Sequence, residues 1–170
     1  MSIAYWSTMD TPVAPFTAIV TGDGAVLASG WTSDVDDLAP QIAPAFRPSE
    51  LRHRRDLGPV SAAVRKYHAG DLAVIDDVEV RQTSGEFLTH AWHVLRTVPP
   101  GKPVTYRDYA ALAGRPAAVR AAASACARNA AALFVPCHRV VRVGGAMGGF
   151  RWGGDVKRWL LAHEERSLAR

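Results

Sequence analysis

The stretch TYRDYAALAGRPAAVRAAASACAR, residues 105–128, indicates two short helices joined by a tight turn. Thr105 is a favourable N-cap residue for a helix over residues 106–112, and Gly114 suits the position just past a helix C-terminus. The alanine run predicts a second helix over residues 117–128, since alanine has the highest helix propensity. The pair has the outline of a helix-turn-helix, which many unrelated helix pairs share.

The second of these helices is unusually rich in small side chains, and two interpretations are open. Alanines let a helix pack tightly against another helix. They also let a helix backbone come very close to another polymer, and Arg120 is then the single long side chain projecting from a smooth surface.

Downstream, residues 136–140 read Pro-Cys-His-Arg-Val, which places a thiol beside an imidazole in an otherwise apolar segment. Pro136 lacks a backbone N–H, so we expect it to end a short strand over residues 133–135 and leave Cys137 at a junction. A cysteine attacks as the thiolate, and a neighbouring imidazole can lower the ordinary thiol pKa of about 8.5. The alternative is that Cys137 is a small core residue.

Other elements follow from apolar periodicity and turn residues. In the second half, helices are predicted over residues 87–98 and 155–168. In the first half, the predicted elements are strands at 16–20 and 25–28 around a turn at 21–24, a short helix at 34–39, a Pro- and Arg-rich connection to Arg55, a helix at 58–68, and strands at 72–75 and 78–80. No motif in this half carries chemistry, so we expect it to be a scaffold.

The composition is that of a globular chain: 170 residues, 48% hydrophobic and 21% charged, with a mean hydropathy of −0.02. No apolar run reaches the ~20 residues of a membrane span, and the N-terminus does not resemble a signal peptide, so a cytoplasmic protein without a membrane partner is expected. The net charge is +4, and residues 102–157 hold nine Lys and Arg against two Asp. That basic excess is compatible with a nucleic-acid partner.

Several motifs resemble the O6-alkylguanine-DNA alkyltransferases, most closely the bacterial branch and the C-terminal part of the adaptive-response protein. The resemblance spans residues 87–164. It rests on Ala118-Val119-Arg120-Ala121, Ser124-Ala125-Cys126-Ala127, Asn129, Pro136-Cys137-His138-Arg139-Val140-Val141, Gly149-Phe150-Arg151-Trp152-Gly153, Lys157 and Glu164.

The resemblance implies a mixed α/β (α+β) fold with two domains. Residues 1–82 would form a small N-terminal ribonuclease-H-like sheet domain, and residues 83–170 a mostly helical domain with the helix-turn-helix. The implied activity is direct-reversal DNA repair. A guanine is flipped out of the duplex, and its O6-alkyl group passes to a cysteine that reacts once.

The catalytic roles carry over from the family. Cys137 would accept the alkyl group, His138 would act as base through a water, and Glu164 would orient the imidazole. Asn129 would hold the turn that presents Cys137. Tyr106 would hydrogen-bond the flipped guanine and protonate it as it leaves.

The implied partner is double-stranded DNA that carries O6-alkylguanine, bound through its minor groove. Arg120 would fill the space left by the flipped base, as side chains inserted by minor-groove proteins do. Ala118 and Ala121 would allow close approach to a groove only about 6 Å wide, with Thr105 and Tyr106 at the start of the first helix. A monomer is expected.

The base pocket is implied to include Cys126, Val140, Phe150, Arg151 and Trp152. Three positions depart from the common family pattern. Phe150 stands where tyrosine is frequent, Ala130 follows Asn129 where proline is usual, and Trp152 is bulky where some relatives have glycine. Phe150 lacks a phenolic hydroxyl and would serve in packing only, and Ala130 would make the turn after Asn129 less stiff. The bulk of Trp152 leads us to expect a narrow pocket that favours methyl over benzyl transfer.

No cofactor is expected, and the absence of cysteine from the first eighty residues predicts no structural metal there. Three other functions remain open. A cysteine hydrolase would need an oxyanion site, which the sequence does not indicate. A non-catalytic binder of alkylated DNA would typically lack the cysteine, and a transcriptional regulator would need an added cysteine-rich zinc domain.

Overall fold

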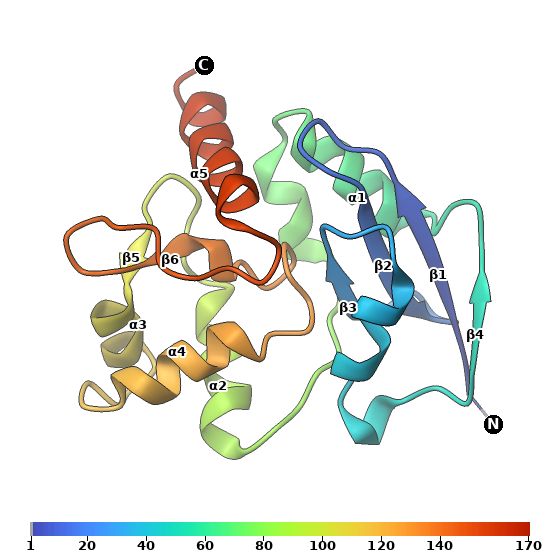
Figure 1. Ribbon diagram of the computed structural model, residues 1–170, viewed down its shortest axis with the longest axis horizontal. Coiled ribbons are helices and arrows are strands. Elements are labelled where there is room, and N and C mark those ends of the chain that lie inside the picture. Colours follow the sequence, from blue (N-terminus) through green and yellow to red (C-terminus); the bar gives the residue numbers. More distant parts are fainter. Residues whose placement is uncertain (1) are drawn as a thin grey trace. The chain divides into compact units, whose positions relative to one another are not determined.

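The computed structural model describes residues 2–170 and divides into two compact units. Unit 1 comprises Met1–Gln82 and Ala130–Phe134, and unit 2 comprises Thr83–Asn129 and Val135–Arg170. The larger sheet lies in unit 1 and most helices lie in unit 2 (Figure 1), in agreement with the predicted fold class. The short return of the chain to unit 1 at residues 130–134 was not expected.

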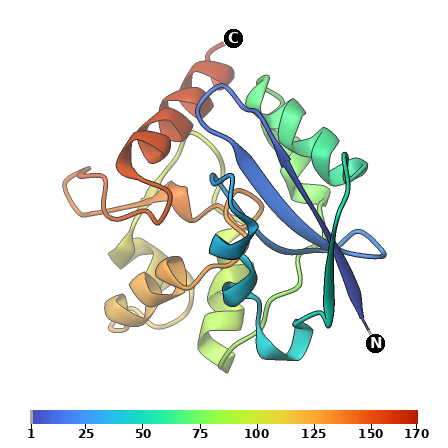
Figure 2. The same ribbon diagram turned by 45° about the vertical axis from the view of Figure 1, so that its right-hand side comes forward.

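Unit 1 is built on a four-stranded sheet with the order β3-β2-β1-β4. Strand β1 is antiparallel to β2 and parallel to β4, and β2 is antiparallel to β3. Helix α1 lies alongside this sheet in two views (Figures 1 and 2). The bounds are Ile3–Met9 for β1, Phe16–Thr21 for β2, Val26–Gly30 for β3, Glu50–His53 for β4 and Pro59–His68 for α1.

The predicted hairpin between β2 and β3 is confirmed. Thr21 N donates to Ala25 O at 2.8 Å, and Gly24 takes a φ of +94° that side-chain-bearing residues rarely adopt. Nearly all of β2 is buried, as expected for a central strand. Phe16 and Ile19 are among the residues that form the core of unit 1.

Two strands predicted in the first half are wrong. Leu72–Asp77 forms a 3₁₀ helix, η4, because its buried residues Leu72 and Ile75 recur at a spacing of three, which suits a 3₁₀ turn and not an alternating strand. Val80 makes only an isolated bridge to Val26. Conversely, strands β1 and β4 were not predicted, and β4 lies in the segment expected to be a connection.

The short helix predicted at residues 34–39 consists instead of 3₁₀ turns, η1 at Val35–Asp37 and η2 at Ala39–Gln41, followed by η3 at Pro44–Phe46. Asp34 caps η1 by accepting from Asp36 N at 2.9 Å. Pro40 cannot donate to a carbonyl one turn earlier, which prevents the turns from merging into one α-helix.

Unit 2 contains the predicted helix pair. Thr105 Oγ1 accepts from Asp108 N at 3.0 Å, so the expected N-cap is confirmed. The two-stranded sheet of this unit pairs β5 with β6 in parallel. The bounds are Glu86–Leu95 for α2, Val104–Thr105 for β5, Tyr106–Leu112 for α3, Val119–Ala127 for α4, Cys137–Arg139 for the 3₁₀ helix η5, Val140–Val141 for β6 and Gly154–Leu168 for α5.

The alanine-rich helix α4 packs against α2 and α3 through its small side chains. Ala122 and Ala125 are fully buried, and Trp92 Nε1 donates to Ala125 O at 2.8 Å. Arg120 remains exposed on the same helix. Tight helix packing and an open arginine-bearing face therefore occur together.

Within residues 2–170, none of the helices combines the length and the apolar character needed to cross a bilayer.

Candidate active site

Cys137 begins the short 3₁₀ helix η5 directly after Pro136 and before strand β6. The strand predicted over residues 133–135 is wrong, because Leu133 has a φ of 81°, which breaks an extended run. Cys137 lies outside any strand, as expected from the preceding Pro136. Only 7% of its surface is exposed.

Asn129 holds the turn that presents Cys137. Its Nδ2 donates to Val135 O at 2.8 Å, and the same carbonyl accepts from Cys137 N at 2.8 Å. Asn129 also hydrogen-bonds the Cys137 side chain. The amide therefore fixes both the backbone before the cysteine and the thiol itself.

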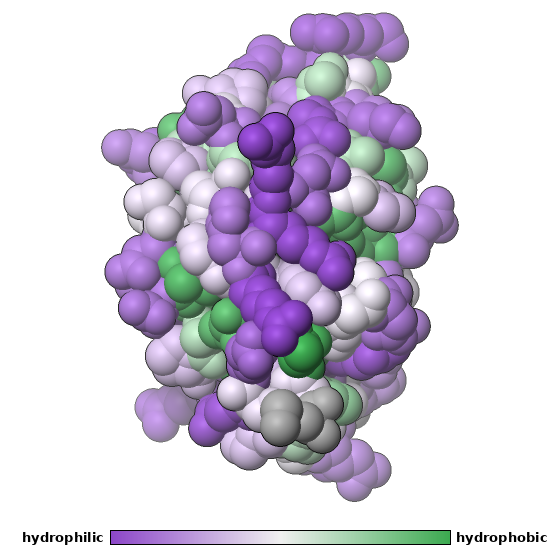
Figure 3. Space-filling model, turned by 90° about the vertical axis from the view of Figure 1, so that its right-hand side faces the viewer, coloured by the Kyte–Doolittle hydropathy of each residue, from purple (hydrophilic) through white to green (hydrophobic). Residues whose placement is uncertain are grey.

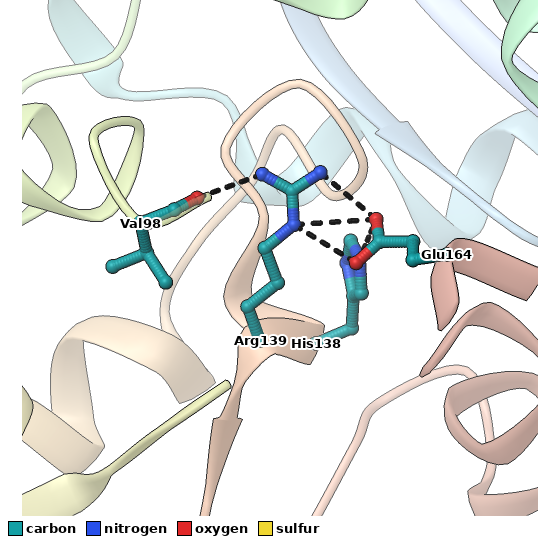
Figure 4. A network of polar contacts seen from close by, with 4 residues as sticks. All are labelled: Val98, His138, Arg139 and Glu164. Atoms are coloured by element: carbon teal, nitrogen blue, oxygen red, sulfur yellow. Dashed lines mark hydrogen bonds and ion pairs between the residues drawn. The ribbon is translucent and has the colours of Figure 1, made fainter. Parts of the chain in front are cut away.

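His138 and Arg139 both turn toward Glu164 of α5 and form a buried polar network (Figure 4). His138 Nε2 lies 2.8 Å from Glu164 Oε2, and Arg139 Nε and Nη2 donate to the same carboxylate at 3.0 and 2.8 Å. Arg139 Nη1 donates to Val98 O at 2.8 Å. All three side chains are almost completely buried, so the network is desolvated.

The ionisation states of this network follow from its contacts. Burial alone would raise the pKa of Glu164, but the hydrogen bonds from His138 and Arg139 and the positive charge of Arg139 hold that pKa well below its usual range. Burial lowers the pKa of His138, which keeps its imidazole neutral at neutral pH. The ionised carboxylate then fixes the proton on Nε2. His138 Nδ1 is buried, makes no hydrogen bond within the described chain, and is left as a proton acceptor.

Burial raises the pKa of the Cys137 thiol, whereas the hydrogen bond from Asn129 and the charge of Lys157 oppose this rise. The expectation that the adjacent imidazole lowers this pKa therefore does not hold in the DNA-free protein. His138 is neutral, and its Nε2 is engaged by Glu164, so it offers no positive charge to stabilise a thiolate. The thiol needs a proton acceptor at the moment of reaction.

Lys157, at the start of α5, is a buried cation in the same region. Its Nζ donates to Val140 O at 2.7 Å and its side chain is fully buried. Its charge lowers the pKa values of both Cys137 and Cys126. A positive charge beside a thiol favours developing negative charge on sulfur.

Tyr106, the first residue of α3, is half-buried beside the loop before α5. Burial is the main reason that its pKa rises to about 12, followed by the nearby Cys126 and Cys137. Gly148 permits this close approach, because a Cβ at that position would lie 3.1 Å from the Tyr106 hydroxyl oxygen. The phenol therefore keeps its proton and can donate it.

The residues expected at DNA lie on the helix pair. Arg120 is exposed on α4, Ala118 is its N-cap residue, and Ala121 is half-buried. Thr105 and Tyr106 mark the start of α3, where the Thr105 hydroxyl caps the helix.

The residues expected to line the base pocket come from α4, β6 and the loop before α5. Val140 is buried, Cys126, Phe150 and Trp152 are half-buried, and burial raises the pKa of Cys126 well above its usual range. The exposed Arg151 donates through Nη2 to Ala127 O at 2.6 Å, which ties the loop to the C-terminal end of α4.

Sequence reasoning assigned no role to Arg139 or Lys157. A usable signal was present for Lys157: together with Leu160 and Glu164 it has the spacing of one helix face, and that face is buried. Nothing local in the sequence indicated that Arg139 would pair with a residue 25 positions later.

Similarity to known proteins extends over most of the chain. Residues 86–166 match the family model described as the DNA-binding domain of 6-O-methylguanine DNA methyltransferase. A methylated-DNA–protein-cysteine methyltransferase from Salmonella typhimurium is 33% identical over 156 residues, and the match covers 91% of each chain. A structure of Mycobacterium tuberculosis OGT in complex with DNA superposes with a TM-score of 0.80 at 25% identity, covering 96% of this chain and 94% of that one.

The bifunctional transcriptional activator/DNA repair enzyme Ada of Escherichia coli is 38% identical over 123 residues. That match covers 72% of this chain but only 33% of Ada, so the chain spans about a third of that relative's length. The Salmonella relative, in contrast, is matched over almost its whole length. The chain belongs to the methylated-DNA–protein-cysteine methyltransferase family.

Proposed function

We propose that this protein repairs DNA by direct reversal, transferring the alkyl group from O6 of a guanine in duplex DNA to the sulfur of Cys137. The observation that carries the proposal is the buried arrangement of Cys137, held by Asn129, next to a neutral His138 that Glu164 orients. The product is a thioether, which is stable, so each molecule reacts once.

The proton balance supports this chemistry. His138 Nδ1 takes the thiol proton from Cys137 through a water, and the sulfur forms its bond to the alkyl carbon as the carbon–O6 bond breaks. The guanine leaves as an anion and receives a proton from the Tyr106 hydroxyl, and the proton held by His138 returns through solvent to the Tyr106 oxygen. The net result moves the alkyl group to sulfur and the thiol proton to guanine.

The helix pair supplies the DNA-binding part of the proposal. Helix α4 presents small side chains and one exposed arginine, Arg120, which suits insertion into the minor groove. Arg120 fills the space left when the alkylated guanine is flipped out. Flipping is required because the O6 substituent cannot be reached within the base stack.

A non-catalytic DNA-binding role is the second candidate. Mass spectrometry of the protein and of its peptides distinguishes alkyl transfer from binding alone. Incubation with duplex DNA that contains O6-methylguanine should add the mass of one CH₂ group to the peptide that contains Cys137. An equal amount of O6-methylguanine in the DNA should be restored to guanine. Binding without any mass gain would overturn the proposed transfer and leave the binding role.

Trp152 is expected to restrict the pocket to small alkyl groups. The variant Trp152→Gly should raise the rate of benzyl transfer relative to methyl transfer roughly ten-fold or more, since the fit of a substituent in such a pocket is worth about 1–3 kcal/mol. Single-turnover rates with O6-benzylguanine and O6-methylguanine measure this ratio. Trp159→Ala, on α5, is the matched control. Equal rates of the unmodified protein on both substrates would contradict the prediction.

The transfer rate should change little between pH 7 and 8 and should persist below about pH 6.5, the ordinary histidine pKa, before it declines in more acidic solution. Burial lowers the pKa of His138, so the base stays neutral near pH 7 and is protonated only in more acidic solution. The unfolded chain takes up that proton near pH ~6.5, so the free energy of unfolding should begin to fall below that pH, before the transfer rate declines. A rate that instead rises steeply toward pH 9 would indicate that a free thiolate limits the reaction.

A further inference from the structure

The arginines of unit 1 are concentrated in one short segment. Unit 1 holds seven Lys and Arg against eleven Asp and Glu, so its net charge is negative. Four of the seven cations nevertheless lie within residues 47–55. We call these four side chains the arginine edge: Arg47, Arg52, Arg54 and Arg55.

The arginine edge is centred on the outer strand of the sheet: Arg52 lies in β4, and the other three arginines lie shortly before or after it. Strand β4 is the last in the order β3-β2-β1-β4 and pairs only with β1. The opposite edge is different, since β3 is bridged to Val80 and Ala131. Figure 3 faces the side that carries β4 in Figure 1 and shows a column of strongly hydrophilic residues down its middle.

Within this group, Arg54 and Arg55 have charges that are not neutralised by a carboxylate in the described chain. Arg52 pairs with Glu50, and Arg47 donates to Ile42 O at 3.1 Å. The Arg54 guanidinium lies 3.4 Å from the centroid of the Tyr5 ring. Stacking on an aromatic ring restrains a guanidinium. Its N–H groups lie in the guanidinium plane and stay free to donate to other groups.

We propose that the arginine edge binds the phosphate backbone of duplex DNA, as a second contact in addition to the helix pair. This inference rests on the proposed function for its DNA partner. Guanidinium groups bind phosphates with paired hydrogen bonds, and the exposed Arg54 and Arg55 present two of them directly after β4. Because the rest of unit 1 is acidic and repels DNA, the arginine edge is where this unit can approach a phosphate.

Charged side chains on an open sheet edge also prevent unwanted strand pairing. The salt dependence of DNA binding distinguishes this role from phosphate binding, since each lost phosphate contact lowers the slope of log Kd against log salt by about 0.9. The variant Arg54→Ser/Arg55→Ser should therefore bind unmodified duplex DNA more weakly, with a slope lower by about two.

Two controls accompany this variant. Arg65→Ser/Arg81→Ser removes the same charge from unit 1 at arginines paired with carboxylates, and it should leave the slope unchanged. Arg54→Lys/Arg55→Lys keeps the charge and should keep most of the slope. If loss of the Tyr5 stack impairs folding, Arg55→Ser alone should still lower the slope by about one.

An unchanged slope in the serine variants, or an equal change in the Arg65/Arg81 control, overturns the inference. Measuring the mass gain on Cys137 in the same samples separates it from the proposed function. Transfer with an unchanged slope rejects only the arginine edge. A lowered slope without any transfer rejects only the alkyl-transfer chemistry.

Discussion

Cys137→Ala is expected to abolish alkyl transfer completely while leaving DNA binding intact. The alanine side chain has no nucleophilic atom that could accept the alkyl group. Arg120 and the helix pair are unchanged in this variant, so the affinity for duplex DNA should remain within about two-fold. The stability cost should be about 1 kcal/mol, on the order of one buried methylene-sized group. Alkyl transfer is measured as the disappearance of O6-methylguanine from duplex DNA.

Cys126→Ala is the matched control for this experiment, because Cys126 is the other of the two cysteines in the sequence. Its thiol is less buried than that of Cys137, but Cys126 lies between two alanines and has no histidine beside it to take up a proton, so it should not act as an acceptor. This variant should keep the full mass gain on Cys137. Clearance of O6-methylguanine by Cys137→Ala would refute the proposed mechanism.

The helical half of the fold could be predicted well, because its signals are local. Thr105 caps α3 as predicted, and the alanine run forms α4. Helix propensity, caps and breakers act within one or two turns, so a short window of sequence contains most of the information.

Unit 1 was predicted less well because strand identity depends on distant partners. Strand β4 has only one partly buried residue, Leu51, and contains Arg52 with Arg54 and Arg55 directly after it, so its sequence resembles a loop. It becomes a strand because β1 pairs with it in a parallel register. In contrast, Leu72–Asp77 has the composition of a strand but no neighbour to pair with as one.

The candidate site was recognised through its motif, whereas the partners of its charges were not. Cys137 and His138 are adjacent in sequence, and Glu164 followed from the resemblance alone. Arg139 shares the Glu164 carboxylate, and Lys157 lies buried near both cysteines. Both contacts depend on how α5 packs against η5. No periodicity in a single chain specifies such a contact.

Glu164→Gln is expected to lower both the transfer rate and the stability, because one carboxylate serves two neighbours. Arg139 would remain buried without its counter-charge, and breaking a buried pair in this way costs about 3–5 kcal/mol. For a chain of this length the melting temperature should fall on the order of 10 °C. The transfer rate should fall roughly 100-fold or more, since the amide no longer selects the Nε2–H tautomer of His138.

The double variant Arg139→Met/Glu164→Gln separates these two effects. Removing both charges takes away the unpaired guanidinium, so most of the lost stability should return, whereas the transfer rate should stay low because His138 still lacks its carboxylate. The melting temperature and the single-turnover transfer rate are measured on four proteins: the unmodified protein, Arg139→Met, Glu164→Gln and the double variant. Recovery of the rate together with stability would show that Glu164 acts only through Arg139 and the fold, and that it does not orient the His138 base.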